Sequence, residues 1–212
     1  MLKNFSHVEK PKISLVITLY NQKEFILKIY SCILNQFLKD IEIIFMDDGS
    51  IDNPFIIIEK LMIKDKRIRF LKKKKNRGQF YSRNSGVLYC RGEYVIIIDP
   101  DDLLLNDILI KAYNLAKKFN LDIVQFYHLM GDYKKDIPII INKKHGLIYG
   151  NETKNLFFDY GTRYLWDKLI RRSIFRKSIY FMKKNIEKRD LLYIMMNLFV
   201  LEFLNQHIHM DK

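Results

Sequence analysis

Three carboxylates follow a short apolar segment near the middle of the chain. Residues Tyr94–Ile98 read YVIII, and Asp99, Asp101 and Asp102 come directly after them. Carboxylates this close together raise one another's pKa, so ionising all three costs free energy. A hard divalent cation such as Mg²⁺ or Mn²⁺ removes that cost, because it prefers oxygen ligands and commonly bridges to substrate phosphates. The sequence therefore predicts a metal site that acts on a phosphate-containing substrate.

An alternative interpretation of the same cluster is an acidic helix cap. In that case Asp102 would open a helix that begins at Leu103. A cap needs only one carboxylate, and three are present within four positions. We therefore favour the metal site over the cap.

A second acidic cluster, DDGS, occupies residues 47–50. Gly49 allows the backbone to turn tightly at this point. The Asp48 carboxylate can accept hydrogen bonds from a base N–H or from ribose hydroxyls. An Asp-Gly pair is also common in ordinary turns, so Asp48 alone would be weak evidence for a binding site.

Hydrogen-bond donors lie between the two acidic clusters, in the segment NRGQFYSRNSG at residues 76–86. Arg77, Arg83 and Asn84 lie near a predicted helix start, where arginine side chains and backbone N–H groups commonly bind phosphate oxygens. The alternative for Arg77 is a solvated basic loop that continues the lysine run at residues 72–75.

Alternating strands and helices must position these residues. The predicted strands are Ile13–Leu19, Ile41–Met46, Arg67–Leu71, Tyr94–Ile98 and Asp122–Tyr127, and the predicted helices are Gln22–Gln36, Pro54–Lys64, Gly78–Cys90 and Leu103–Phe119. This alternation indicates an α/β fold with a mainly parallel sheet in three layers. Such sheets bind ligands at the carboxyl ends of their strands, so both acidic clusters should meet at one edge. No G-x-G-x-x-G or Walker A motif is present, which argues against the common dinucleotide and P-loop sites.

Composition narrows the class of protein further. The 212 residues carry a net charge of +13, which suits an anionic partner: a nucleotide, a nucleic acid or an acidic membrane surface. The only cysteines, Cys32 and Cys90, exclude a disulfide framework. The first 12 residues lack the apolar region of a signal peptide, and no apolar stretch reaches the roughly 18 residues of a membrane span. We therefore expect a cytoplasmic protein, with peripheral membrane association as an extension of that expectation.

The ordered set of motifs resembles the inverting family 2 glycosyltransferases, which have a GT-A fold. The matching segments are TLYN at residues 18–21, DDGS at 47–50 with Asp52 and Asn53 after it, NRG and SRNSG within 76–86, and GEY followed by DPDD within 92–102. Ser82 stands where alanine is usual. The resemblance runs continuously over residues 12–130 and implies a Rossmann-like, three-layer α/β/α core.

The resemblance also implies a nucleotide-diphosphate sugar donor, with a UDP-sugar favoured. Asp48 would then read the base, and Thr18 and Tyr20 would line the base pocket. Arg77 and Arg83 would contribute to donor binding. Nucleic acid is not expected as a partner, because the acidic strand ends would repel its phosphates.

For the metal, the resemblance implies Mn²⁺ or Mg²⁺ bound by Asp102 together with Asp101. Asp101 would also support the ribose and the diphosphate. Asp99 is expected to steady the turn that carries them.

The later part of the chain resembles the acceptor side of the same enzymes. Trp166, Lys168 and Leu169 match a W-x-K-L segment found beside the acceptor site. Asp190 is the candidate catalytic base, with Glu187 as the next choice, although the acidic pair usual in the family is not intact here. The acceptor would be a glycan or a lipid-linked molecule.

The predicted organisation is an N-terminal extension (1–11), a nucleotide-sugar-binding core (12–130) and an acceptor-side region (131–212). In the last region we expect a hairpin of residues 137–141 and 146–149, a helix from residue 151 and a buried helix at Leu191–Leu204. The predicted activity is hexosyl or N-acetylhexosaminyl transfer. Alternatives are a degenerate or truncated transferase that binds donor with poor turnover, a nucleotidyltransferase, and a nucleic-acid-binding module.

Overall fold

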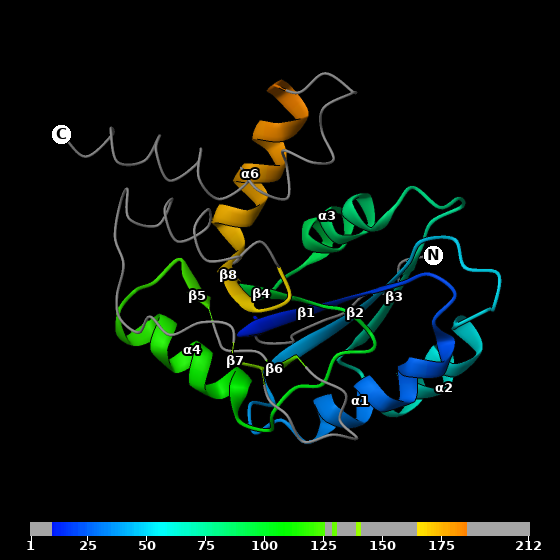
Figure 1. Ribbon diagram of the computed structural model, residues 1–212, viewed down its shortest axis with the longest axis horizontal. Coiled ribbons are helices and arrows are strands. Elements are labelled where there is room, and N and C mark those ends of the chain that lie inside the picture. The colour runs from blue at the N-terminus through cyan, green and yellow to red at the C-terminus, as the bar shows by residue number, and fades with distance from the viewer. Residues whose placement is uncertain (1–9, 126–128, 131–138, 141–164, 186–212) are drawn as a thin grey trace. The chain divides into compact units, whose positions relative to one another are not determined.

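A computed structural model describes residues 10–125, 129–130, 139–140 and 165–185 of the protein (Figure 1). The chain forms two compact units. The first comprises residues 1–124 and 168–176, and the second comprises residues 125–167 and 177–212. The predicted boundary at residue 130 stays a prediction, although a strand from the later part of the chain belongs to the first unit.

Six strands form the central sheet, in the order β3-β2-β1-β4-β8-β5. Their bounds are β1 Ile13–Leu19, β2 Ile41–Asp47, β3 Ile68–Lys72, β4 Tyr94–Ile98, β5 Ile123–Gln125 and β8 Lys168–Arg171. Strands β1, β2, β3 and β4 are parallel to one another, and β8 runs antiparallel to β4. The mainly parallel α/β sheet predicted from the sequence is therefore confirmed.

The middle of the sheet is buried from end to end. Every residue of β1, β2 and β4 is buried, as expected for parallel strands covered on both faces. The register places Leu19 beside Asp47 and Ile17 beside Ile98. The residues that follow β1, β2 and β4 therefore leave the sheet at one edge, which we call the carboxyl edge.

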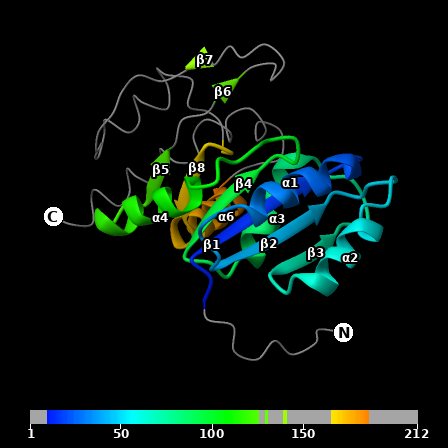
Figure 2. The ribbon, with the colours of Figure 1, turned by 90° about the horizontal axis from the view of Figure 1, so that it is seen from below.

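Helices cover both faces of this sheet. They are α1 (Ile26–Leu34, after the short 3-10 helix η1 at Lys23–Phe25), α2 (Phe55–Lys64), α3 (Gln79–Tyr89) and α4 (Ile108–Lys118). Helices α1, α2 and α4 lie on one face, and α3 lies on the other (Figures 1 and 2). Helix α3 packs closely on β1, since a Cβ at Gly86 would lie 2.4 Å from Val16 Cγ1. Only glycine permits that approach of helix to strand.

The described part of the second unit contains a short antiparallel pair. Strand β6 (Leu129–Met130) pairs with β7 (Ile139–Ile140). Helix α6 (Arg172–Asn185) starts in the first unit, directly after β8. In the part of the chain that the structure describes, no helix combines the length and the hydropathy needed to cross a bilayer.

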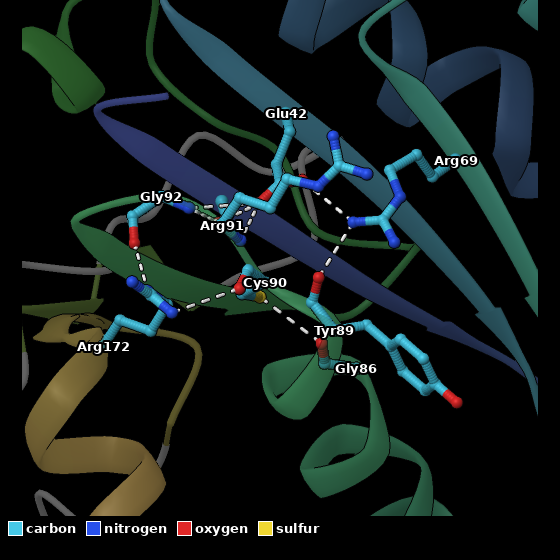
Figure 3. A network of polar contacts seen from close by, with 9 residues as sticks. Glu42, Arg69, Gly86, Tyr89, Cys90, Arg91, Gly92 and Arg172 are labelled. Carbon is cyan, nitrogen blue, oxygen red and sulfur yellow. Dashed lines mark hydrogen bonds and ion pairs between the residues drawn. The ribbon is translucent and has the colours of Figure 1, made fainter. Parts of the chain in front are cut away.

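A buried carboxylate joins the amino ends of three strands, opposite the carboxyl edge (Figure 3). Glu42 on β2 is only 4% exposed. Its Oε1 accepts hydrogen bonds from Ser14 Oγ (2.5 Å), from Gly92 N–H (3.1 Å) and from the backbone N–H of Arg91. Its Oε2 lies 3.2 Å from Arg69 NH1. Because Ser14 is on β1 and Gly92 precedes β4, one side chain holds three neighbouring strands in register.

The same network continues through backbone carbonyls around Gly92. Arg69 NH1 also donates to Tyr89 O (2.8 Å), and Arg172 Nε donates to Gly92 O (2.7 Å). A Cβ at Gly92 would lie 2.6 Å from the Ser14 backbone nitrogen, so the close approach requires glycine. Burial raises the pKa of the neighbouring Cys90 thiol to about 12, which keeps this sulfur protonated and unreactive.

Two predicted helix boundaries were wrong. The first predicted helix ends at Leu34 rather than at Gln36, and Phe37 beyond it is 67% exposed. The fourth begins at Ile108 rather than Leu103. Long-range hydrogen bonds explain the delay: Gln36 Nε2 donates to Leu105 O (2.7 Å), and Phe37 N–H donates to Asn106 O (3.0 Å). These bonds hold the segment before α4 in an extended path.

Differences also occur late in the chain. Strand β8 was not predicted, and neither was the pairing of β7 with β6. Those residues, the helix expected from residue 151 and the Leu191–Leu204 helix all lie outside the described residues.

Candidate active site at the carboxyl edge

The turns that follow β1 and β2 are joined by hydrogen bonds into one rigid piece. Asn21 has a positive φ of 53°. Its N–H donates to Ser50 Oγ (3.0 Å), and its Oδ1 accepts from Ile51 N–H (2.9 Å). Asp52 Oδ2 accepts from Lys23 N–H (2.9 Å). Hydrogen bonds therefore link the TLYN and DDGS turns directly, because a side chain of each turn bonds to a backbone N–H group in or next to the other.

The first aspartate of the DDGS turn has a structural role. Asp47 is fully buried, and its Oδ1 accepts a hydrogen bond from Ser50 N–H (2.8 Å), which closes the turn. Gly49 follows with φ of 82°, and a Cβ there would lie 2.9 Å from Asn76 N. The loop between β3 and α3 thus packs directly on this glycine.

The second aspartate, Asp48, meets that same loop. Arg77 N–H lies 3.2 and 3.3 Å from the two carboxylate oxygens, and Lys73 Nζ lies 3.5 Å from Oδ1. The Asp48 side chain is 4% exposed. Both oxygens of this carboxylate are therefore held by backbone and side-chain groups of the loop between β3 and α3.

The residues predicted to line a base pocket also lie at the carboxyl edge. Thr18 is near the end of β1, and its buried Oγ1 has no hydrogen-bond partner among the described residues. Tyr20 follows that strand and is 46% exposed. A buried hydroxyl without a partner is uncommon in native structures, so Thr18 is a candidate contact for a bound ligand.

The Asp99 carboxylate is held by helix α3. Arg83 NH2 lies 2.7 and 2.9 Å from its two oxygens, and Gln79 Nε2 donates to Oδ1 (3.0 Å). This arrangement suits the expectation that Asp99 steadies the turn after β4. Arg83 is 7% exposed, and this ion pair occupies its NH2 group, so its contribution to donor binding stays a prediction. Arg77, by contrast, is exposed, with its guanidinium 4.7 Å from the centre of the Tyr81 ring.

The remaining two carboxylates of this turn, Asp101 and Asp102, are exposed and half-buried respectively. The pKa of Asp102 is raised to about 6. Burial is the largest cause, and the nearby carboxylates of Asp99 and Asp101 contribute to the same shift. The alternative of a helix cap is excluded, because α4 begins at Ile108, after Asp107, and not at Leu103. The Asp102 carboxylate therefore has no helix to cap.

Oxygen donors of this kind fit a hard divalent cation, whose charge would relieve the repulsion that raises the pKa of Asp102. Among the described residues, no group of three or more histidine, cysteine or carboxylate side chains forms a complete metal-binding cluster. Two carboxylates completed by substrate phosphates and water would be the ordinary Mg²⁺ arrangement.

The sequence of the chain matches the family model for glycosyl transferase family 2 over residues 14–179. The chain belongs to glycosyl transferase family 2. Its sequence is 34% identical over 200 residues to a cholesterol galactosyltransferase from Borreliella burgdorferi, a match that covers 89% of this chain and 55% of the relative. It is 31% identical over 173 residues to the uncharacterized glycosyltransferase EpsJ from Bacillus subtilis, covering 79% of this chain and 50% of that one. The chain thus spans about half the length of these curated relatives.

Solved structures place this family 2 chain in the GT-A class of fold. TarS from S. aureus superposes with a TM-score of 0.71 at 18% identity, covering 91% of this chain and 55% of TarS. TarS has also been solved in complex with UDP. The mannosyltransferase PcManGT from Pyrobaculum calidifontis, solved with GDP-Man and Mn²⁺, superposes with a TM-score of 0.51 at 20% identity over 55% of this chain and 35% of its own. The predicted GT-A α/β fold is therefore confirmed.

The W-x-K-L residues, predicted to lie beside the acceptor site, are found at the start of β8. Lys168 and Leu169 lie in β8 and are buried, and Trp166 is half-buried. Asp167, which sequence reasoning passed over, is fully buried and accepts a hydrogen bond from Gln125 Nε2 (3.0 Å). Glu187 and Asp190 lie outside the described residues.

Sequence reasoning also missed polar residues around the two acidic clusters. Gln79 supports Asp99, and Lys73 with Ser82 lies beside Asp48. Gln79 is part of the NRGQFYSRNSG segment, but nothing local marks it as a partner of a turn that follows 20 residues later. The lysine run at residues 72–75 gave no indication that one of its members is largely buried.

Proposed function

We propose that this chain transfers a sugar from a nucleotide-diphosphate donor, preferably a UDP-sugar, to a hydroxyl acceptor. Transfer would proceed with inversion at the anomeric carbon and with the assistance of Mn²⁺ or Mg²⁺. One observation carries the proposal: in a family 2 chain, Asp48 after β2 and Asp101 and Asp102 after β4 leave the sheet at the same edge. The complexes of TarS with UDP and of PcManGT with GDP-Man support a nucleotide-sugar donor.

In this proposal the donor lies along the carboxyl edge. Asp48 accepts a hydrogen bond from the base, Thr18 and Tyr20 line the base pocket, and Asp101 supports the ribose and diphosphate. Arg77 is exposed at the start of α3 and is free to bind a phosphate oxygen. Arg83 would act on the donor mainly by fixing the Asp99 turn.

Asp102 and Asp101 would hold the metal ion. When bound, Mn²⁺ or Mg²⁺ supplies charge stabilisation to the departing nucleoside diphosphate, where negative charge accumulates. Arg77 adds a second positive group near the same phosphates. The chain's own contribution is to keep Asp101 and Asp102 on a turn that Arg83 and Gln79 fix through Asp99.

A donor screen tests the proposal. The chain would be incubated with Mn²⁺ and UDP-, GDP- or dTDP-sugars together with hexose-terminated and lipid-linked acceptors, and released nucleotide would be measured. Acceptor-dependent release, with product of inverted anomeric configuration, is expected for a UDP-sugar of the hexose or N-acetylhexosamine type. Metal-dependent binding of a nucleotide without release would favour the degenerate or truncated transferase. Family membership leaves little support for a nucleotidyltransferase or a nucleic-acid-binding module.

The proposed catalytic base is Asp190, with Glu187 as the alternative. Asp190 precedes the apolar Leu191–Leu204 segment, and a carboxylate at a helix start is kept ionised by backbone N–H groups, which suits a proton acceptor. Asp190→Asn keeps a competent helix cap, so stability and UDP affinity should be nearly unchanged. The rate of sugar transfer should fall on the order of 100-fold or more. Full activity of Asp190→Asn, with loss of activity in Glu187→Gln, would assign the base to Glu187.

We also propose peripheral association with the cytoplasmic face of an anionic membrane. Helices α1 and α2 lie side by side and expose large aliphatic side chains: Leu27 (57%), Leu34 (44%), Ile56 (54%) and Ile63 (69%). Exposed lysines flank them on both helices, at Lys28, Lys60 and Lys64. Apolar contact combined with positive charge is the usual basis of interfacial binding to anionic lipid.

Sedimentation with vesicles tests that surface. The chain should pellet with vesicles containing anionic lipid at about 0.15 M salt, where the screening length is roughly 8 Å. Leu27→Ser with Ile63→Ser should reduce the bound fraction several-fold, because the apolar contact is lost. Equal sedimentation of the variant and the parent chain would show that this surface does not bind lipid.

A further inference from the structure

We propose that Lys73 is a specificity-determining residue of the donor site, which acts with Asp48 to select a base that presents a ring N–H beside a carbonyl oxygen. This inference rests on the proposed function, because it concerns the same nucleotide. It adds a residue and a chemical criterion that the family resemblance does not provide.

The position of Lys73 is fixed by three elements of the fold. It follows β3, and its backbone N–H donates to Asp47 O (2.9 Å). Its Nζ donates to Ser82 Oγ on α3 (2.9 Å) and lies 3.5 Å from Asp48 Oδ1 after β2. The Lys73 side chain is only 16% exposed, and Ser82 is fully buried. The amine is therefore held in one place, unlike the exposed Lys72, Lys74 and Lys75 of the same run.

A purely structural role explains this arrangement poorly. Burial lowers the pKa of Lys73, and the Asp48 carboxylate offsets that effect only in part. Buried ion pairs are generally weak contributors to stability, because the desolvation cost consumes most of the attraction. A group buried at a cost beside the base-reading residue is a candidate for recognition.

The pair presents a hydrogen-bond acceptor next to a hydrogen-bond donor. The Asp48 carboxylate keeps acceptor capacity that Arg77 N–H and Lys73 do not use, and Lys73 Nζ carries a hydrogen that neither Ser82 nor Asp48 uses. Uracil presents the complement, with N3–H as donor and the adjacent O4 as acceptor. Cytosine in the same orientation presents the reverse at both positions, an unprotonated N3 and an amino group. Thymine and guanine share the N–H beside C=O arrangement with uracil, so the pair separates these bases from cytosine.

Calorimetric titration with UDP and CDP in the presence of Mn²⁺ tests the inference, because the two nucleotides differ only at these positions of the ring. The parent chain should prefer UDP. Lys73→Met should lower the affinity for UDP by about tenfold or more, as expected for loss of a charge-assisted hydrogen bond, and should lower the affinity for CDP only by the smaller amount that loss of one positive charge near the diphosphate causes. The ratio of the two affinities should therefore fall.

Lys74→Met is the matched control, since it removes the same charge from an exposed neighbour. It should weaken UDP and CDP alike, through the diphosphate, and leave their ratio unchanged. Ser82→Ala removes only the anchor of the amine and should narrow the ratio to a smaller extent, which provides a second readout if Lys73→Met does not fold.

The outcomes separate this inference from the proposed function. An unchanged UDP-to-CDP ratio in Lys73→Met and Ser82→Ala, with UDP still bound by the parent chain, would overturn the role of Lys73 alone. A parent chain that prefers CDP would also overturn it. A parent chain that binds none of UDP, GDP and CDP with Mn²⁺ would overturn both.

Discussion

Replacing Asp102 with asparagine is expected to remove the metal-dependent part of UDP binding and to abolish sugar transfer. In the parent chain, Mn²⁺ should raise the affinity for UDP, because Asp101 and Asp102 would hold the ion and its charge would offset that of the diphosphate. An asparagine at this position keeps the size of the side chain but loses its negative charge. We expect the affinity for UDP with Mn²⁺ to fall by about 100-fold or more. The reason is that a metal ion contributes several kcal/mol by stabilising the negative charge of the phosphates.

A nearby carboxylate supplies the control for this experiment. Asp107 precedes α4, is 36% exposed at its side chain and pairs with Lys111 (2.5 Å). Asp107→Asn makes the same chemical change five residues from Asp102 and should leave UDP affinity unchanged. Equal UDP binding with and without Mn²⁺ in the parent chain would contradict the assignment of Asp102 as a metal ligand.

The same variant should stabilise the metal-free protein. The pKa of Asp102 is raised from 3.8 to about 6, mainly by burial, so the folded chain binds this proton more tightly than the unfolded chain does. Stability of the parent chain therefore falls as the pH rises between these two values, and asparagine avoids that loss. Asp102→Asn should melt at a higher temperature than the parent near pH 8 and at a similar temperature near about pH 4. Loss of UDP binding together with higher thermal stability would exclude misfolding as its cause.

The regular part of the fold could be predicted because burial leaves a direct pattern in the sequence. Strands β1 and β4 have the predicted bounds, since parallel strands covered on both faces read as unbroken apolar runs. Strand β8 could not be predicted in this way. It has four residues with a charged residue at each end, and its partner β4 lies more than 70 positions earlier in the chain.

The candidate site shows the same limit. The two acidic clusters were found because their residues are adjacent in sequence and follow recognisable strands. Their supports come from elsewhere in the chain: Gln79 and Arg83 for Asp99, and Lys73 for Asp48. Contacts of this kind depend on the packing of α3 against the sheet, which no local pattern reports. The start of α4 was missed for the same reason, because Gln36 holds the preceding segment from a distance of 69 residues in sequence.

The second large effect is expected at the opposite edge of the sheet, where Glu42→Gln should destabilise the fold. Glu42 is 4% exposed and accepts three hydrogen bonds at Oε1 while it pairs with Arg69 at Oε2. A glutamine can satisfy the three donors with its amide oxygen only by turning its NH₂ group toward Arg69. Either Arg69 or the three donors then lose their acceptor. Leaving a buried charged group without its partner typically costs about 3 kcal/mol.

Urea unfolding would measure this loss as a lower transition midpoint, and thermal unfolding as a decrease of about 6–12 °C in Tm. Glu24→Gln is the matched control, because Glu24 is exposed on η1 and a surface substitution normally changes stability by less than about 0.5 kcal/mol. The UDP affinity of the folded Glu42→Gln protein should equal that of the parent, since the network joins the amino ends of β1, β2 and β4 and the candidate site lies at their carboxyl ends. If Glu42→Gln is as stable as the parent, Arg69 and the three donors must find other partners. If the variant is stable but fails to bind UDP, the two edges of the sheet must be coupled.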